Sequence, residues 1–218
     1  MRILVDSADL AAIRDALETG FVAGATTNPS LLRRAGVSAV AVPDLARAIL
    51  DAGAGELHLQ ATAADVAGLV DEGRRLAALD PARVRIKLVA TPDGYRAAAR
   101  LAVEGIPVTL TGVYTVRQAL VADSVGARSI AVYLGRLRDM GEDPMALVGS
   151  MQALFDTQAS AAEILAASIR EPDELVELAL IGVASATIAP PVLHRMLDSD
   201  ATAAAAATFA DDAEAIAR

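Results

Sequence analysis

Short apolar runs alternate with longer segments of helical periodicity along the whole chain. The runs are rich in β-branched and aliphatic residues, which is typical of buried strands. Eight of them are predicted as strands, at residues 2–6, 20–24, 56–60, 84–89, 107–111, 129–133, 163–167 and 183–188. Helical patterns follow them, for example over residues 9–17, 42–52, 64–78, 92–103 and 115–125. This alternation predicts parallel strands that are joined by crossover helices.

The number of predicted strands favours one fold, a single (β/α)8 TIM barrel of the α/β class over residues 1–218. An open doubly wound sheet usually has fewer strands and an early glycine-rich phosphate turn, and Gly20, Gly24 and Gly36 do not have that spacing. The alanine-rich segment before Phe209 predicts an extra C-terminal helix over about residues 200–218. We expect this helix to cover a barrel edge, a barrel mouth or a neighbouring subunit.

Charge and composition argue against several classes of function. A net charge of −9 with scattered lysines and arginines argues against a nucleic-acid partner. Without cysteines, and with only His58 and His194 as histidines, neither a thiolate nor a His-rich metal site is expected. Asp6 stands where a signal peptide would continue its apolar region, and the least polar stretch contains Pro190 and Pro191. We therefore expect a cytoplasmic protein without a membrane span.

One lysine, Lys87, lies late in the predicted strand at residues 84–89. Such a lysine either belongs to an edge strand, with its stem packed and its ammonium in water, or lies in a lined cavity. In a cavity, desolvation lowers the pKa and leaves some free amine at neutral pH, and a free amine attacks carbonyls. The second interpretation is a Schiff-base lysine, and this stretch alone favours the first.

In a barrel of this kind, chemistry takes place where the strands end and the loops begin. Taken singly, the polar residues there have ordinary explanations, because Asp6 could cap a helix and Asn28 could start one. Ser168 with Arg170 could be a cap and a surface ion pair. Their convergence on Lys87 indicates one site instead. The polar residues at these strand ends are Asp6, Thr26, Thr27, Asn28, Gln60, Lys87, Thr109, Thr111, Tyr133, Arg136, Ser168 and Arg170.

Four segments resemble the transaldolase family in order and spacing. They are Thr-Thr-Asn-Pro-Ser-Leu at residues 26–31, Ile-Lys-Leu at 86–88, Tyr-Leu-Gly-Arg at 133–136 and Leu-Ala-Ala-Ser-Ile-Arg at 165–170. The first segment is the specific signal, and the likeness runs from Met1 to Met196. The resemblance implies a (β/α)8 barrel, a class I aldolase mechanism through a lysine Schiff base, and sugar-phosphate substrates. It also implies a homo-oligomer that needs neither a metal nor an organic cofactor.

The resemblance implies roles on the donor side of the site. Lys87 corresponds to the lysine that attacks the C2 carbonyl of the keto donor and retains the dihydroxyacetone unit as an enamine. Asp6 and Asn28 resemble the residues that hold the donor hydroxyls, with Asp6 also assisting proton transfer. Thr26 and Thr27 belong to the same motif as Asn28 and are expected among the substrate-binding residues.

The resemblance also implies a water site and an anion site. Gln60 and Thr111 correspond to groups that position a catalytic water next to the lysine. Arg136, Ser168 and Arg170 resemble the site for the acceptor phosphate, which suits the forked geometry of a guanidinium.

Two positions bear on the branch of the family. Gln60 stands where transaldolases generally carry Glu, and Tyr133 stands where they carry Phe. Both are similar to the small fructose-6-phosphate aldolases, in which the tyrosine hydroxyl shuttles the proton that releases free dihydroxyacetone. We therefore expect reversible cleavage of fructose 6-phosphate to dihydroxyacetone and glyceraldehyde 3-phosphate. Leu-Gly-Arg at residues 134–136 resembles the transaldolase branch instead, so a transaldolase is the alternative, and a non-catalytic sugar-phosphate-binding paralogue is a further one.

Two residues depart from the usual pattern of the family. Strand alternation puts Arg85 on the same side as Lys87, and His58 on the same side as Gln60. A polar layer would then lie beneath the lysine, with Asp6 or Glu56 as counter-charges, and the guanidinium would lower the pKa of Lys87. The alternative is a strand bulge that turns Arg85 outward.

Overall fold

The strands form one closed parallel barrel in sequence order. The structure, a computed structural model, describes residues 1–217. The strands are β1 (Arg2–Asp6), β2 (Val22–Thr26), β3 (Glu56–Gln60), β4 (Val84–Val89), β5 (Val108–Val113), β6 (Ser129–Tyr133), β7 (Glu163–Ala167) and β8 (Ser185–Ile188). β1 pairs with β8 and closes the barrel, which confirms the predicted (β/α)8 fold.

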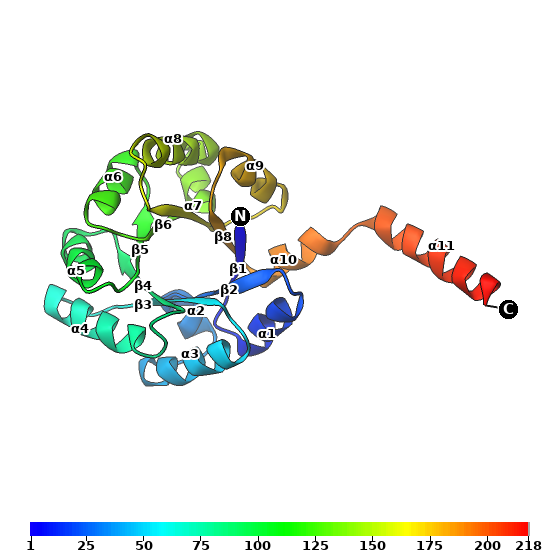
Figure 1. Ribbon diagram of the computed structural model, residues 1–218, viewed down its shortest axis with the longest axis horizontal. Coiled ribbons are helices and arrows are strands. Elements are labelled where there is room, and N and C mark those ends of the chain that lie inside the picture. The colour runs from blue at the N-terminus through cyan, green and yellow to red at the C-terminus, as the bar shows by residue number, and fades with distance from the viewer. Residues whose placement is uncertain (218) are drawn as a thin grey trace.

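A ring of helices surrounds the barrel (Figure 1). Side-chain caps start several of them, since Asp9, Asp65, Thr91 and Thr115 each accept a hydrogen bond from a backbone N–H of the first turn. The helices are α1 (Leu10–Glu18), α2 (Pro29–Arg34), α3 (Val42–Asp51), α4 (Val66–Ala77), α5 (Pro92–Val103), α6 (Val116–Ser124), α7 (Leu134–Asp139), α8 (Pro144–Thr157), α9 (Asp173–Ile181), α10 (Pro190–Leu197) and α11 (Asp200–Ile216), with a 3₁₀ turn at Ala39–Ala41.

Three predicted strands differ from the observed ones at their ends. β2 begins two residues later than predicted, because Gly20 adopts a φ of +80° and belongs to the turn after α1. Thr26, predicted to follow the strand, is its last residue and pairs with Asp6 in the sheet. β5 continues to Val113 through a register shift against β6, and β8 begins at Ser185. The order of the elements was predictable, and these ends were not.

Alternate residues of the strands divide the protein into two apolar regions. Side chains such as Val5, Leu57 and Ile86 face the helices and belong to the large core outside the barrel. Leu4, Ala131 and Leu165 form a separate buried cluster inside it. The inward positions on either side of this cluster carry mostly polar residues, so the barrel interior is where chemistry is available.

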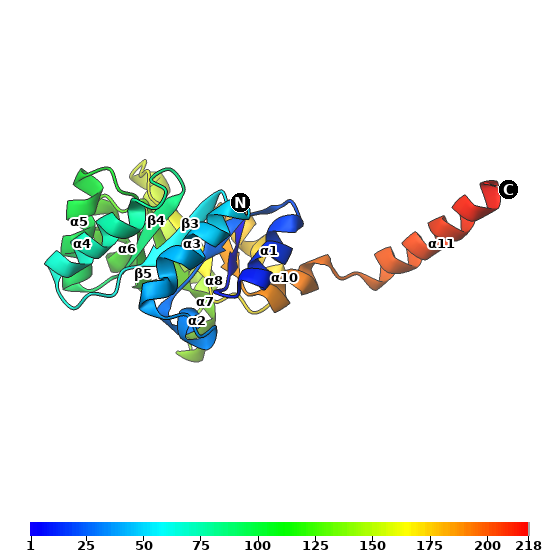
Figure 2. The same ribbon diagram turned by 90° about the horizontal axis from the view of Figure 1, so that it is seen from below.

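The C-terminal helix α11 projects away from the barrel in both views (Figures 1 and 2). None of its described residues is buried, and the Phe209 side chain is 70% exposed. The predicted extra helix is confirmed over Asp200–Ile216, whereas residue 218 lies outside the described residues. The helix covers neither an edge nor the mouth of its own barrel (Figures 1 and 2), so those two expectations are wrong, and contact with a neighbouring subunit stays a prediction. No helix within residues 1–217 has both the length and the apolar character needed to cross a bilayer.

Candidate functional site

A cavity of about 620 Å³ opens where the strands end. Polar residues from strand ends all around the barrel line it, which places the predicted convergence on a single surface. The predicted site residues in its lining are Asp6, Asn28, Gln60, Thr111, Tyr133, Arg136 and Ser168.

Lys87 lies one inward-facing position below Val89, which lines the cavity. Its side chain is almost fully buried, with the residue 3% exposed, and its Nζ donates a hydrogen bond to the Thr27 carbonyl at 3.0 Å. A closed barrel has no edge strand, so the interpretation as a wet edge-strand lysine is wrong. Burial lowers the pKa of Lys87, and the negative charge of Asp6 partly opposes this. The residue is therefore a buried amine beside a carboxylate.

The Asp6 carboxylate is held by a directed pair of hydrogen bonds. Its Oδ1 accepts from the Thr26 hydroxyl at 2.7 Å, and because a carboxylate only accepts, Thr26 must be the donor. Thr187 then donates to Thr26, also at 2.7 Å. Thr26 and Thr27 are buried and do not line the cavity, so they hold Asp6 and Lys87 from behind.

Asn28 combines the two explanations that the sequence offered. Its Oδ1 accepts from the Leu31 N–H at 3.0 Å and caps α2, with Pro29 at the first helical position. Within residues 1–217 its amide nitrogen has no hydrogen-bond partner. Gln60 lines the same cavity, and its side-chain amide has no partner in the described residues either. Both amides are available to a ligand.

Tyr133 lies in the centre of a group of polar and aromatic side chains on one side of the cavity. Its hydroxyl forms a short hydrogen bond with that of Thr111, and burial raises its pKa, so the phenol is protonated at neutral pH. The guanidinium carbon of Arg136 lies 4.9 Å from the centre of the Tyr133 ring. Arg136 also donates to the Tyr114 hydroxyl at 3.4 Å, and the two tyrosine rings meet edge to face at 6.1 Å.

The end of β7 carries a strained serine. Ser168 has a φ of 57°, a conformation that non-glycine residues adopt at a cost and that often marks a functional site. Its carbonyl accepts from the Gly135 N–H at 2.9 Å, and a Cβ at Gly135 would lie 2.7 Å from that oxygen, so glycine is required there. Arg170 is outside the cavity lining, because its guanidinium pairs with Asp139 at 2.5 Å.

Among the lining residues that were not predicted as site residues are an arginine and a second tyrosine. Arg34, in the last turn of α2, and Tyr114, directly after β5, both line the cavity. The sequence feature that could have indicated Arg34 is its place at the end of α2, the helix that Asn28 caps. Helical spacing alone does not say which loop a charged side chain will face.

Beneath the lysine lies the predicted polar layer. His58 and Arg85 both face inward, and Glu56 is the counter-charge: its Oε1 lies 2.6 Å from His58 Nε2 and 3.1 Å from Arg85 Nε. Burial raises the pKa of Glu56, but the hydrogen bonds from His58 and Arg85 and the positive charge of Arg85 outweigh this and lower it to about 2. Burial lowers the pKa of His58, and burial, rather than the predicted guanidinium, lowers that of Lys87.

The hydrogen bonds of this layer fix the tautomer of His58. The Glu56 carboxylate only accepts, so His58 Nε2 carries the proton and Nδ1 accepts from the Thr109 hydroxyl at 3.0 Å. Ser129 then donates to Thr109 at 2.7 Å. This acid, histidine and hydroxyl arrangement resembles a nucleophilic triad, but Thr109 is fully buried, so it supports the site and does not touch a substrate.

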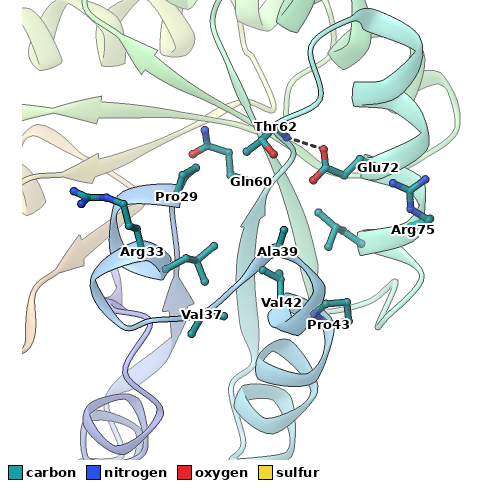
Figure 3. A pocket seen from close by; sticks show the side chains of 12 residues that line it. Pro29, Arg33, Val37, Ala39, Val42, Pro43, Gln60, Thr62, Glu72 and Arg75 are labelled. Carbon is teal, nitrogen blue, oxygen red and sulfur yellow. Dashed lines mark hydrogen bonds between the residues drawn. The ribbon is translucent and has the colours of Figure 1, made fainter.

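A second cavity, of about 430 Å³, lies outside the barrel between α2, α3 and α4 (Figure 3). It shares Pro29 and Gln60 with the first cavity and is otherwise lined mainly by apolar side chains. Glu72 on its wall accepts from the backbone N–H groups of Thr62 and Ala63 at 2.7 and 2.9 Å, which ties α4 to the end of β3. In the described part of the chain, no group of three or more His, Asp or Glu is arranged to hold a metal ion.

Solved structures with a similar fold include mandelate oxidase with benzoyl-formic acid, at a TM-score of 0.62 and 15% identity, covering 88% of this chain and 65% of the other. A mutant mandelate oxidase with (S)-mandelic acid is equally similar, at a TM-score of 0.62, 16% identity, and 88% and 65% coverage. The chain spans less than two thirds of the length of these oxidases, and at such identities the likeness concerns the barrel fold alone.

The sequence comparisons are more specific. A "Probable transaldolase" of Nitrosopumilus maritimus is 36% identical over 99% of this chain and 96% of the relative. Another of Geobacillus kaustophilus is 36% identical over 93% of both chains, and one of Geotalea daltonii is 34% identical over 99% of both. The family model described as Transaldolase/Fructose-6-phosphate aldolase matches residues 3–218. The chain therefore belongs to the transaldolase/fructose-6-phosphate aldolase family and is an enzyme of the Schiff-base aldolase type.

Proposed function

We propose that this enzyme cleaves fructose 6-phosphate reversibly to dihydroxyacetone and glyceraldehyde 3-phosphate, with Lys87 as the Schiff-base residue. The observation that carries the proposal is the buried Lys87 amine, whose pKa is lowered and which lies under a cavity lined by Asp6 and Tyr133. A lowered pKa increases the fraction of free amine, and only the free amine attacks a carbonyl.

The first half of the reaction forms the imine and breaks a carbon–carbon bond. The Lys87 nitrogen adds to C2 of the ketose, and loss of water gives a protonated imine. Asp6 then accepts the proton of the C4 hydroxyl, the C3–C4 bond breaks, and its electron pair moves to the iminium nitrogen as an enamine forms. Glyceraldehyde 3-phosphate leaves, and the dihydroxyacetone unit stays on the lysine.

The second half decides between the two branches of the family. The Tyr133 hydroxyl, protonated and bonded to Thr111, donates a proton to C3 of the enamine, and a water positioned by Gln60 and Thr111 hydrolyses the imine. Free dihydroxyacetone is then the product. In a transaldolase, the enamine attacks a second aldose phosphate instead. That alternative is favoured by Leu-Gly-Arg at residues 134–136 and by the names of the relatives.

The remaining polar residues complete the substrate site in this proposal. The free amide of Asn28 binds a donor hydroxyl, and Arg136 with the Ser168 hydroxyl binds the acceptor phosphate. Arg170 contributes to the phosphate site by exchanging its Asp139 partner for the ligand.

Product analysis with and without an acceptor tests the branch. The enzyme is incubated with fructose 6-phosphate alone, and free dihydroxyacetone is measured; it is then measured again with a second aldose phosphate present. We expect dihydroxyacetone without any acceptor, and we expect Tyr133→Phe to suppress its release more than transfer. Turnover that requires the acceptor identifies a transaldolase, and equal loss of both activities in Tyr133→Phe removes Tyr133 from its assigned role.

We further propose that the protein is a cytoplasmic homo-oligomer in which α11 contacts a neighbouring subunit. The support is the helix itself, which leaves Phe209 and Ile216 exposed although both are large and apolar. Truncation after Ser199 should lower the number of chains per particle, obtained from the molar mass measured by light scattering and the mass of the shortened chain. An unchanged number of chains would show that α11 is not a subunit contact.

A further inference from the structure

Arg34 is a cationic side chain of the cavity to which the proposed mechanism gives no task. It is exposed at the end of α2 and lines the cavity. Its guanidinium has no hydrogen-bond or carboxylate partner within residues 1–217. Many other arginines of this acidic chain do have carboxylate partners, among them Arg2, Arg83, Arg85, Arg128, Arg138 and Arg170.

The charges around the cavity differ from those of the chain as a whole. The chain has a net charge of −9, whereas the charged residues of the lining are Asp6, Arg34 and Arg136. Asp6 already accepts from Thr26 and faces Lys87. The cavity mouth therefore presents an excess of positive charge, which suits an anionic ligand.

The two arginines stand on opposite sides of the barrel mouth. Arg34 belongs to α2, which follows β2, and Arg136 belongs to α7, which follows β6. In a closed barrel with strands in the order β1 to β8, β2 and β6 are four strands apart in either direction. Arg170 is outside the lining and pairs with Asp139, so Arg34 and Arg136 are the two lining guanidiniums that have no carboxylate partner among the described residues.

We propose that Arg34 is an anion-binding residue that selects phosphorylated substrates, acting across the mouth from Arg136. This inference rests on the proposed function. The ligand chemistry is a phosphate monoester, which comes either from the acceptor aldehyde or from a donor phosphorylated at C1. A guanidinium can bind the phosphate of either substrate through two parallel N–H donors.

The chain provides a matched control in Arg33. It precedes Arg34 in the last turn of the same helix, is also exposed and without a partner in the described residues, and lies in the wall of the second cavity. Any favourable interaction with the negative end of the helix is available to both arginines. A difference in phosphate affinity between Arg33→Gln and Arg34→Gln is therefore due to the cavity that Arg34 lines and not to the end of the helix.

The experiment measures aldol synthesis by the full-length enzyme with three substrate pairs: dihydroxyacetone with glyceraldehyde, dihydroxyacetone with glyceraldehyde 3-phosphate, and dihydroxyacetone phosphate with glyceraldehyde. Inorganic phosphate is the competitive probe. We expect Arg34→Gln to raise the inhibition constant of phosphate, and the KM for a phosphorylated partner, by about three- to tenfold, with kcat retained. The unphosphorylated pair should be unaffected, and the effect should shrink in high salt. The pair whose KM rises identifies the phosphate that Arg34 binds.

Two further variants make the result decisive. Arg34→Lys should restore part of the phosphate affinity, because it keeps the charge but not the fork. Identical phosphate inhibition in the native enzyme, Arg33→Gln and Arg34→Gln would overturn the inference. Borohydride trapping of dihydroxyacetone on Lys87 is measured in the same variants, so that failure of the Schiff-base chemistry is seen separately from failure of the Arg34 assignment.

Discussion

The polar layer beneath Lys87 makes a strong prediction about stability. Glu56 is buried, and it holds His58 Nε2 at 2.6 Å and Arg85 Nε at 3.1 Å, with Arg2 Nε at 3.6 Å. Glu56→Gln removes the charge and leaves His58 and Arg85 without a carboxylate, whereas Arg2 keeps Glu163. Breaking a buried ion pair on one side is costly, because the remaining charge stays desolvated.

The magnitude follows from the pKa of Glu56, which falls from 4.5 to about 2 in the folded protein. A lowered carboxyl pKa stabilises the folded state above the unfolded value and ceases to do so as the pH falls through the folded value. The contribution is at most about 3 kcal/mol at neutral pH and is lost between about pH 4.5 and about pH 2. For a chain of this length, Glu56→Gln should lower Tm by about 6 to 12 °C.

The assay is urea unfolding, followed by circular dichroism, at about pH 7 and about pH 3, where about half of the difference should have gone. Glu104→Gln is the control, since Glu104 also bonds an arginine, Arg74 at 2.6 Å, but on the surface. We expect no measurable change for the control. If both variants unfold at the same urea concentration, or if the deficit of Glu56→Gln is independent of pH, the description of the buried carboxylate is wrong.

Three further predictions concern the same interior. Lys87→Met should abolish activity yet raise stability at neutral pH, because a lysine pKa lowered below 10.5 means that folding disfavours the charged form; urea unfolding that shows a loss would contradict this. Arg85→Leu removes the nearer of the two arginines of Glu56 and raises the pKa of that carboxyl, so the loss of stability at acid pH should be complete at a higher pH; urea unfolding with the same pH dependence as the native enzyme rejects the coupling. Gly135→Ala should raise KM for phosphorylated acceptors because its Cβ would displace Ser168, and KM values equal to those of the native enzyme would refute that contact.

Periodicity in the sequence was sufficient for the barrel and for its inward-facing residues. Strands of period two make the direction of a side chain predictable once the strand is placed. Arg85 and His58 lie inside with Lys87, and β3 and β4 pair without a register shift, so the alternative of a bulge that turns Arg85 outward is wrong. The end of β2 was misplaced because Gly20 continues the apolar run in composition while its backbone makes a turn. The local sequence pattern therefore predicted which elements form better than it predicted where they begin and end.

Contacts between distant segments were not predictable. Arg170 lies in the loop after β7, its partner Asp139 ends α7, and no spacing rule links the two. Arg34 was missed because its position in the last turn of a short helix does not say which cavity its side chain will line. Periodicity predicted the helix α11, but it does not say what the exposed side chains of that helix contact.

Covalent trapping examines the role of Lys87 itself. The enzyme is mixed with dihydroxyacetone or fructose 6-phosphate, reduced with borohydride and digested, and the peptides are mapped by mass spectrometry. We predict a stable adduct on Lys87, carrying the reduced dihydroxyacetone unit, that is absent from Lys87→Met. Full turnover without any adduct on Lys87, or an adduct on a residue other than Lys87, would contradict a Schiff-base mechanism at this residue.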